Sequence, residues 1–94
     1  MRRDARVDGN HKEHFDLARQ LGGVVIDTRS VGHGAPDGFV YVPRQRRWLA
    51  VENKTARGRL TAQQAPLHVQ APIEIWRVRE DVYRAFGVRI GGVR

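Results

Sequence analysis

Two short apolar segments with a brief polar connection between them constrain the fold of this chain most. Residues Asp37–Val42 and Trp48–Lys54 are rich in aromatic and β-branched side chains, which is typical of strands. The connection of five residues is short enough for a hairpin, so the two strands are expected to pair. In such a pair, Asp37 at the start of the first strand can lie beside Glu52 or Lys54 at the end of the second.

The other predicted elements follow from periodicity and from turn residues. In chain order they are a helix from Asn10 that ends at Gly22, a strand over Val24–Thr28, a helix that opens at Thr61 and ends by Pro72, a strand over Ile73–Val78 and a helix over Arg79–Phe86. Pro66 indicates that the second helix is kinked or starts later than Thr61. The order predicts an α/β fold with a mixed sheet flanked by helices, in a single domain over residues 1–94. We interpret residues 1–9 as a basic arm or an irregular lead-in, and residues 88–94 as a short strand or a disordered tail.

The charge balance indicates a polyanionic partner. Seventeen Lys and Arg against ten Asp and Glu give a net charge of +7, and arginine suits bidentate contacts with phosphate. Nucleic acid is the first expectation and an anionic membrane the second. The absence of cysteine excludes disulfides, thiol catalysis and cysteine-based zinc sites. No apolar run approaches a membrane span and the first residues lack a signal peptide, so we expect a soluble cytoplasmic protein without membrane contact.

The ends of the two central strands carry the candidate chemistry. Asp37 and Glu52 would form an oxygen-rich pocket, which suits Mg²⁺ or Mn²⁺. Lys54 shares a strand face with Glu52, about 7 Å along the backbone. Such a set can support metal-assisted hydrolysis of a phosphodiester. Simpler interpretations stay open: Asp37 as a turn residue, a Glu52–Lys54 ion pair, and Lys54 as a solvated strand end.

Two residues on the helices are further candidates. Glu13 lies within about 40° of Leu17 around the first helix, next to its apolar stripe, and could reach the edge of the sheet. Gln64 could reach it from the second helix. Each residue can instead belong to a capping box, Glu13 with Asn10 and Gln64 with Thr61.

Clustered basic side chains are candidates for contact with phosphate. They are Arg44, Arg46, Arg47, Arg57, Arg59 and the loop residue His33. The alternative is a solvated basic rim and an ordinary loop histidine. Trp48, beside the first cluster, could stack on a base, but packing in a core or an interface is the preferred interpretation.

These motifs together resemble a known family. Gly34-x-Pro36-Asp37, Glu52-x-Lys54 and Arg59-Leu60-Thr61-x-x-Gln64 follow a helix that carries Asn10-x-x-Glu13. This arrangement is similar to a compact PD-(D/E)XK nuclease, in particular the small stand-alone VRR-NUC type of phages and bacteria. The resemblance covers about residues 8 to 82.

The resemblance implies a restriction-endonuclease-like αβββαβ core that binds Mg²⁺ or Mn²⁺. Asp37 and Glu52 would be metal ligands with the backbone carbonyl of Asn53, and Lys54 would serve the nucleophilic water. Gln64 would support the site, Glu13 would be the helix-borne acid that holds the metal or its water, and His68 also occupies a family-like position. Pro66 departs from the family pattern. It would change the shape of the second helix and thereby the direction in which the Gln64 side chain points. The asparagine in Glu-Asn-Lys departs too, although only its carbonyl is needed.

These residues and this resemblance predict a metal-dependent DNA endonuclease. We expect it to act as a homodimer on branched DNA such as four-way junctions. Its expected location is the cytoplasm of a bacterium or of a phage-infected host. Self-association is favoured because one small core needs less aromatic surface than the chain offers in Trp48, Trp76, Tyr83 and Phe86. The alternative is a non-catalytic accessory protein that binds nucleic acid, and an RNase is also open.

Overall fold

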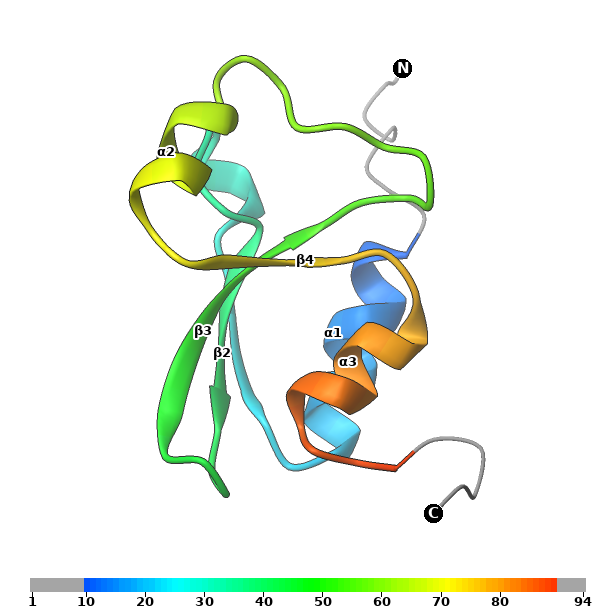
Figure 1. Cartoon of the computed structure of the whole chain (residues 1–94). Helices are drawn as coiled ribbons and strands as arrows, with labels where there is room; N and C mark the ends of the chain where they lie inside the picture. Colours follow the sequence, from blue (N-terminus) through cyan, green and yellow to red (C-terminus); the bar gives the residue numbers. More distant parts are fainter. Residues whose placement is uncertain (1–9, 90–94) are drawn as a thin grey trace.

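The computed structural model describes residues 10–89, and the expectations for residues 1–9 and for the end of the tail lie outside this range. The elements are α1 (His11–Gln20), β1 (Val24–Asp27), the short 3₁₀ turn η2 (Arg29–Val31), β2 (Gly38–Val42), β3 (Arg47–Asn53), α2 (Ala65–Gln70), β4 (Ile73–Trp76) and α3 (Arg79–Ala85). Their order confirms the predicted α/β succession (Figure 1).

The four strands form one mixed sheet in the order β1-β2-β3-β4. β1 pairs antiparallel with β2 and β2 with β3, whereas β3 and β4 run parallel. The predicted hairpin is therefore present, and Gly38 lies opposite Val51. In an antiparallel pair, one residue earlier on β2 corresponds to one residue later on β3, so the register brings Asp37, just before β2, toward Glu52.

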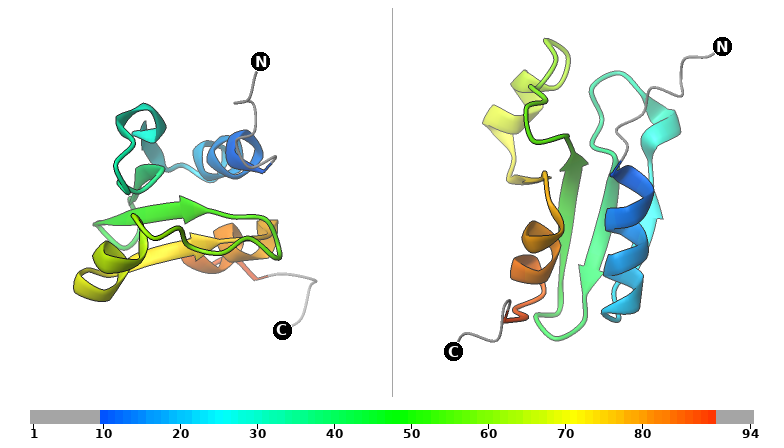
Figure 2. Two further views of the ribbon diagram at one scale, coloured as in Figure 1. Left: turned by 90° about the horizontal axis from the view of Figure 1, so that it is seen from above. Right: turned by 90° about the vertical axis from the view of Figure 1, so that its right-hand side faces the viewer.

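One face of the sheet is covered by two helices. Figures 1 and 2 show α1 and α3 together on this face, and α2 beside the upper end of the sheet. The core consists of Phe15, Leu17, Ala18, Val40, Val42, Leu49, Val51, Trp76, Val82 and Phe86. Leu49 and Val51 share this face, as their spacing predicts. The aromatics Trp76 and Phe86, expected to be in surplus, are core residues here.

The opposite face is more open than the sequence suggests. The continuous apolar run Leu49–Val51 is typical of a strand buried on both faces, but Ala50 is only half-buried and Trp48 is 49% exposed. Trp48 packs against Tyr41 of the paired strand, with ring centroids 5.2 Å apart. α2 lies beside one end of the sheet, away from α1 and α3, and it starts at Ala65, which agrees with the late start that Pro66 indicates.

In the described part of the chain, no helix is long and apolar enough to cross a bilayer.

Candidate functional site

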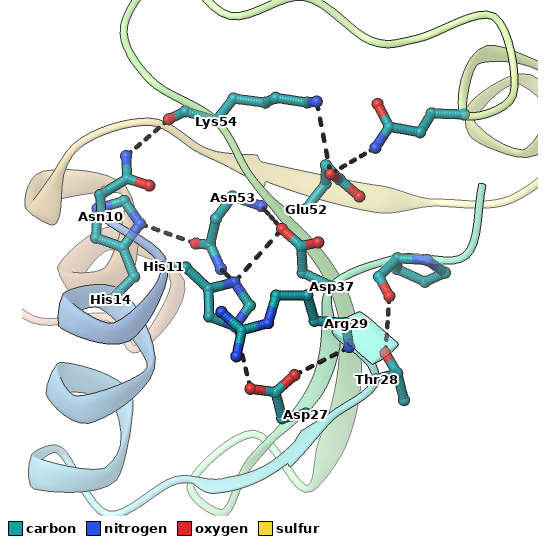
Figure 3. A network of polar contacts seen from close by, with 12 residues as sticks. Asn10, His11, His14, Asp27, Thr28, Arg29, Asp37, Glu52, Asn53 and Lys54 are labelled. Carbon is teal, nitrogen blue, oxygen red and sulfur yellow. Dashed lines mark hydrogen bonds and ion pairs between the residues drawn. The ribbon is translucent and has the colours of Figure 1, made fainter. Parts of the chain in front are cut away.

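The candidate site lies at the end of the sheet opposite the β2–β3 turn. β3 ends here at Asn53, β1 ends at Asp27, and Asp37 leads into β2. Lys54 continues from β3, with its backbone N–H donating to Trp76 O at 3.0 Å. Figure 3 shows the polar side chains converging from these elements and from the start of α1.

Glu52 and Lys54 share one face of β3, as predicted, and both are buried. Glu52 is 1% exposed and Lys54 is 9% exposed. Lys54 Nζ lies 3.7 Å from Glu52 Oε2. The pair is thus a buried ion pair as well as a candidate catalytic set, and a solvated strand end is the wrong interpretation for Lys54.

Gln64 fills both of the roles that the sequence left open, in the site and in the capping box. Its Nε2 donates to Glu52 Oε2 at 2.8 Å, and its Oε1 accepts from Thr61 N at 2.9 Å. Thr61 Oγ1 in turn accepts from Gln64 N at 3.2 Å. The capping-box contacts with Thr61 therefore hold the amide in the orientation that supports Glu52, despite Pro66 two residues later.

Gly34 explains how the loop before Asp37 reaches this region. Its φ is +82°, a conformation that glycine adopts readily. A Cβ at this position would lie 2.3 Å from Gln63 O. Only glycine permits this approach, which packs the Gly34–Asp37 loop against the segment that carries Gln64.

Asp37 is held by the ends of two strands. Its Oδ2 accepts from Asn53 N at 2.8 Å, and its backbone oxygen accepts from Thr28 N at 2.8 Å. These bonds tie Asp37 to β3 and to the segment after β1. The aspartate of the Pro-Asp-Gly triplet therefore faces the polar cluster, and the interpretation as a turn residue that simply faces water is wrong.

Two histidines of α1 enter the cluster, and neither was predicted to lie there. His14 Nδ1 lies 2.9 Å from Asn53 Oδ1, and His11 Nδ1 lies 3.3 Å from Asn53 Nδ2. His11 Nε2 lies 3.1 Å from Asp27 Oδ2, while its Nδ1 is 3.7 Å from Asp37 Oδ2. The spacing of His11, His14 and Phe15 along one helix face was the available signal.

The electrostatics of this network follow from its carboxylates. Burial by itself lowers the pKa of His11, but contacts with Asp37 and Asp27 outweigh it and raise that pKa above its ordinary value. Burial by itself raises the pKa of Asp27, but hydrogen bonds from Arg29 N and His11 outweigh it and lower that pKa. The two groups therefore stabilise each other's charged form.

Glu13 does not join the cluster. Its side chain is half exposed, and its Oε2 lies 3.6 Å from Arg79 Nε at the start of α3. Asn10 does not cap the helix with its side chain either, so the alternative role of Glu13 in a capping box with Asn10 is not observed. Asn10 Nδ2 instead donates to Lys54 O at 2.8 Å and to Arg77 O at 3.0 Å.

His68 lies beside the site on α2. Burial and the nearby charge of Lys54 both lower the pKa of its imidazole. Its buried Nε2 has no hydrogen-bond partner among the described residues. Both effects favour the neutral form of the His68 imidazole.

The candidate basic side chains divide between the two ends of the sheet. Arg57 and Arg59 follow the end of β3, and His33 lies in the loop before Asp37, so these three belong to the end that carries the carboxylates. The cluster Arg44, Arg46 and Arg47 belongs to the β2–β3 turn at the other end. With strands rising about 3.3 Å per residue, the two groups lie on the order of 20 Å apart.

Arg47 also lines a surface cavity of about 310 Å³ near the same end. Glu74, Asp81 and Arg84 line it as well, and Arg84 Nη1 lies 2.7 Å from Asp81 Oδ1. This cavity is separate from the candidate site, and its mixed charges do not favour an anion.

The donor set at the site is suited to a hard cation that keeps most of its water. The part of the chain that the structure describes contains no preformed group of three or more His, Cys, Asp and Glu residues able to hold a metal. Asp37 and Glu52 supply two carboxylates at neighbouring positions. Mg²⁺ commonly binds through one or two carboxylates while it retains several waters, so these residues fit it.

Comparisons with known proteins address the fold. The sequence matches no protein-family model and no curated protein. A solved structure described as a VRR_NUC domain is similar over 81% of this chain and 88% of that chain, with a TM-score of 0.65 and 24% sequence identity. The fold is therefore that of a VRR_NUC domain, which confirms the expected restriction-endonuclease-like architecture.

Proposed function

We propose that this protein is a metal-dependent nuclease that hydrolyses phosphodiester bonds in DNA. The observation that carries the proposal is the buried Glu52–Lys54 pair beside Asp37, with Gln64 bonded to the same carboxylate. A charged pair buried at a strand end is costly to maintain, so a functional use is favoured over a purely structural one. The VRR_NUC fold and the net charge of +7 support the same proposal.

Each side chain has a distinct task in this proposal. Asp37 and Glu52 would hold Mg²⁺ or Mn²⁺, with the Asn53 carbonyl as a further donor. The bound ion would supply Lewis-acid polarisation of the phosphate and activation of water. Lys54 would orient the attacking water or stabilise the charge that develops on the phosphate. Gln64 would keep Glu52 in its orientation, whereas Glu13 is no longer proposed as a ligand because it is paired with Arg79.

The basic residues suggest how DNA would lie. Arg57, Arg59 and His33 would contact phosphates close to the cleaved bond. Arg44, Arg46 and Arg47, at the far end of the sheet, would contact a more distant part of the duplex or a second arm of a branched substrate. This separation is compatible with selectivity for branched DNA, such as a four-way junction.

A homodimer is proposed as the working form. Trp48, Val24 and Ile26 leave large apolar surface on the open face of the sheet. A two-fold dimer through this face would bury that surface and provide two active sites. Trp48→Arg should reduce the mass measured by light scattering from two chains to one, whereas an unchanged mass would place the interface elsewhere. A wild-type mass of one chain with full activity would refute the dimer.

The decisive experiment is a cleavage assay on a panel of substrates. Duplex, single-stranded, flap and four-way-junction DNA, with a matched RNA, are incubated with Mg²⁺, Mn²⁺ or chelator. We expect metal-dependent cleavage of DNA that Glu52→Gln abolishes, with the junction cut faster than the duplex. Robust cleavage in chelator would refute the metal mechanism. Binding without cleavage under every condition would favour the non-catalytic alternative, and preferential cleavage of RNA would change the substrate class.

A further inference from the structure

His11 is a buried polar residue whose position the proposed roles leave unexplained. It is 4% exposed and lies at the first turn of α1, between a carboxylate at the end of β1 and the candidate ligand Asp37. Its ring also packs against Phe15, with centroids 4.7 Å apart. Phe15 therefore fixes the imidazole on its apolar side. The polar contacts in Figure 3 fix its nitrogens.

The hydrogen bond to Asp27 fixes the orientation of this ring. His11 Nε2 lies 3.1 Å from Asp27 Oδ2. Nε2 carries a proton both in the imidazolium and in the neutral tautomer that donates to Asp27, so the contact persists in either charge state. A histidine oriented by a carboxylate in this way presents its other nitrogen in one direction.

Asp27 is itself held in place. Its Oδ1 accepts from Arg29 N at 2.9 Å, while its backbone belongs to the strand that pairs with β2 opposite Gly38. Thr28, the next residue, donates to the backbone oxygen of Asp37. The carboxylate that orients His11 is thus attached to the same strand end as Asp37.

The contacts of Asp37 within the described residues fall on one of its two carboxylate oxygens. Oδ2 accepts from Asn53 N at 2.8 Å and lies 3.7 Å from His11 Nδ1. His11 Nδ1 is itself 3.3 Å from Asn53 Nδ2, so His11 acts on Oδ2 both at ion-pair distance and through Asn53. A carboxylate held at one oxygen can present the other to a ligand without rotating. The geometry therefore restrains Oδ2 and leaves Oδ1 for an incoming group.

We propose that His11 and Asp27 are a positioning pair that restrains Asp37 Oδ2 and thereby presents Oδ1 to the divalent cation. In this chain the contribution of α1 to the site is then a histidine backed by an aspartate, in place of the expected acid Glu13. The inference rests on the proposed function, because it assigns the pair to the same cation. Neither residue is required to touch the substrate.

The test measures binding of Mn²⁺ by isothermal titration calorimetry on the full chain, in parallel with cleavage kinetics. Asp27→Asn keeps the shape of the side chain but weakens its hold on His11. Because groups that orient a metal ligand typically contribute about 10- to 100-fold in metal affinity, we expect Asp27→Asn to weaken Mn²⁺ binding about tenfold or more. Its KM for DNA should stay within about twofold, since the proposal gives neither side chain a contact with DNA.

Two further variants separate positioning from a purely structural role. Asp16→Asn makes the same chemical change at an equally exposed carboxylate of α1 that pairs with Lys12 and Arg19, away from the site, so it should bind Mn²⁺ as wild type does. Asp27→Glu retains the carboxylate and should recover most of the affinity that Asp27→Asn loses. If His11→Gln unfolds, the partly exposed Asp27 position still provides the measurement, because its side chain is 39% exposed.

The outcomes distinguish this inference from the proposed function. Wild-type protein that binds Mn²⁺ and cleaves DNA, with an unchanged Mn²⁺ affinity in Asp27→Asn, would overturn the positioning pair and leave the nuclease intact. Wild-type protein that neither binds Mn²⁺ nor cleaves would overturn both. Weakened metal binding in Asp27→Asn, recovered in Asp27→Glu and absent in Asp16→Asn, would support the pair.

Discussion

The buried pair of Glu52 and Lys54 makes a quantitative prediction about stability that is separate from catalysis. With Nζ and Oε2 3.7 Å apart, their Coulomb attraction is about 4.5 kcal/mol at an effective dielectric constant of about 20. Desolvation of the two ions offsets much of this attraction in the intact protein. Removal of only one partner leaves the other charge buried, which typically costs about 3–5 kcal/mol.

A double-mutant cycle isolates this effect. Lys54→Met and Glu52→Gln nearly preserve side-chain volume, so they avoid the cavity that alanine would create at these buried positions. Each single change should lower the free energy of unfolding by about 3 kcal/mol. The double variant should lose clearly less than the sum, with a coupling energy of about 2 kcal/mol. Both single variants should also lack cleavage activity below their unfolding midpoints.

The assay is urea unfolding followed by circular dichroism, with chelator present so that no metal contributes. A matched control is the exposed pair of Lys12 and Asp16, which is closer, at 2.6 Å, but solvated. Lys12→Met with Asp16→Asn should show no measurable coupling, because water screens exposed charges. A Glu52–Lys54 coupling below about 0.5 kcal/mol would refute the reasoning that burial makes this pair interdependent.

The remaining predictions concern packing, pH and salt. Gly38→Ala should destabilise the protein by about 1–3 kcal/mol in urea unfolding, because a Cβ at this position would lie 2.7 Å from Phe15 and from a β1 carbonyl. Gly58→Ala, in a more loosely packed loop, is the control. Equal stabilities of the two variants would refute the close packing at Gly38. Asp81 accepts a hydrogen bond from Arg77 N at 2.7 Å. Burial by itself raises the pKa of Asp81, but this bond and the contact with Arg84 outweigh it, so the pKa lies below 3.8. The stability that the Asp81 carboxylate contributes is present above pH 3.8 and is lost as pH falls through its folded pKa. Asp81→Asn should therefore be less stable than wild type at pH 7, and the difference in free energy of unfolding should narrow in acid. A difference that stays constant with pH would contradict this role of Asp81. If about five phosphates are contacted, log K for DNA should fall with log salt at a slope near −4 to −5 in fluorescence titrations, and a flat dependence would exclude the basic residues as the contact surface.

Much of the fold and part of the site could be predicted because they depend on local sequence. A short polar connection forces the neighbouring strands to pair, and the register then brings Asp37 toward Glu52. The alternation of side chains along a strand likewise puts Glu52 and Lys54 on one face. Gln64 was predictable as well, since Thr61 three residues earlier fixes its orientation locally.

Burial on the two faces of the sheet was less predictable. A short apolar segment such as Leu49–Val51 does not indicate whether helices cover one face of the sheet or both faces. The observed structure covers one face with α1 and α3 and leaves Trp48 exposed on the other. Conversely, Trp76 and Phe86 are core residues because α3 packs on β4, which is a contact between elements that no local pattern specifies.

What the sequence by itself determined was the order of the elements, the hairpin and the carboxylates at its open end, since these follow from short-range pairing. Only the tertiary structure decided which residue of α1 enters the site. The packing of Phe15 against the sheet sets the rotation of that helix, and at 100° per residue Glu13 lies about 160° away from Phe15 around its axis. His11, one turn before Phe15, consequently faces Asp37 and Asp27, whereas Glu13 faces solvent and Arg79. A helix can rotate about its axis without any change in its hydrogen bonds, so only packing selects the side chain that it contributes.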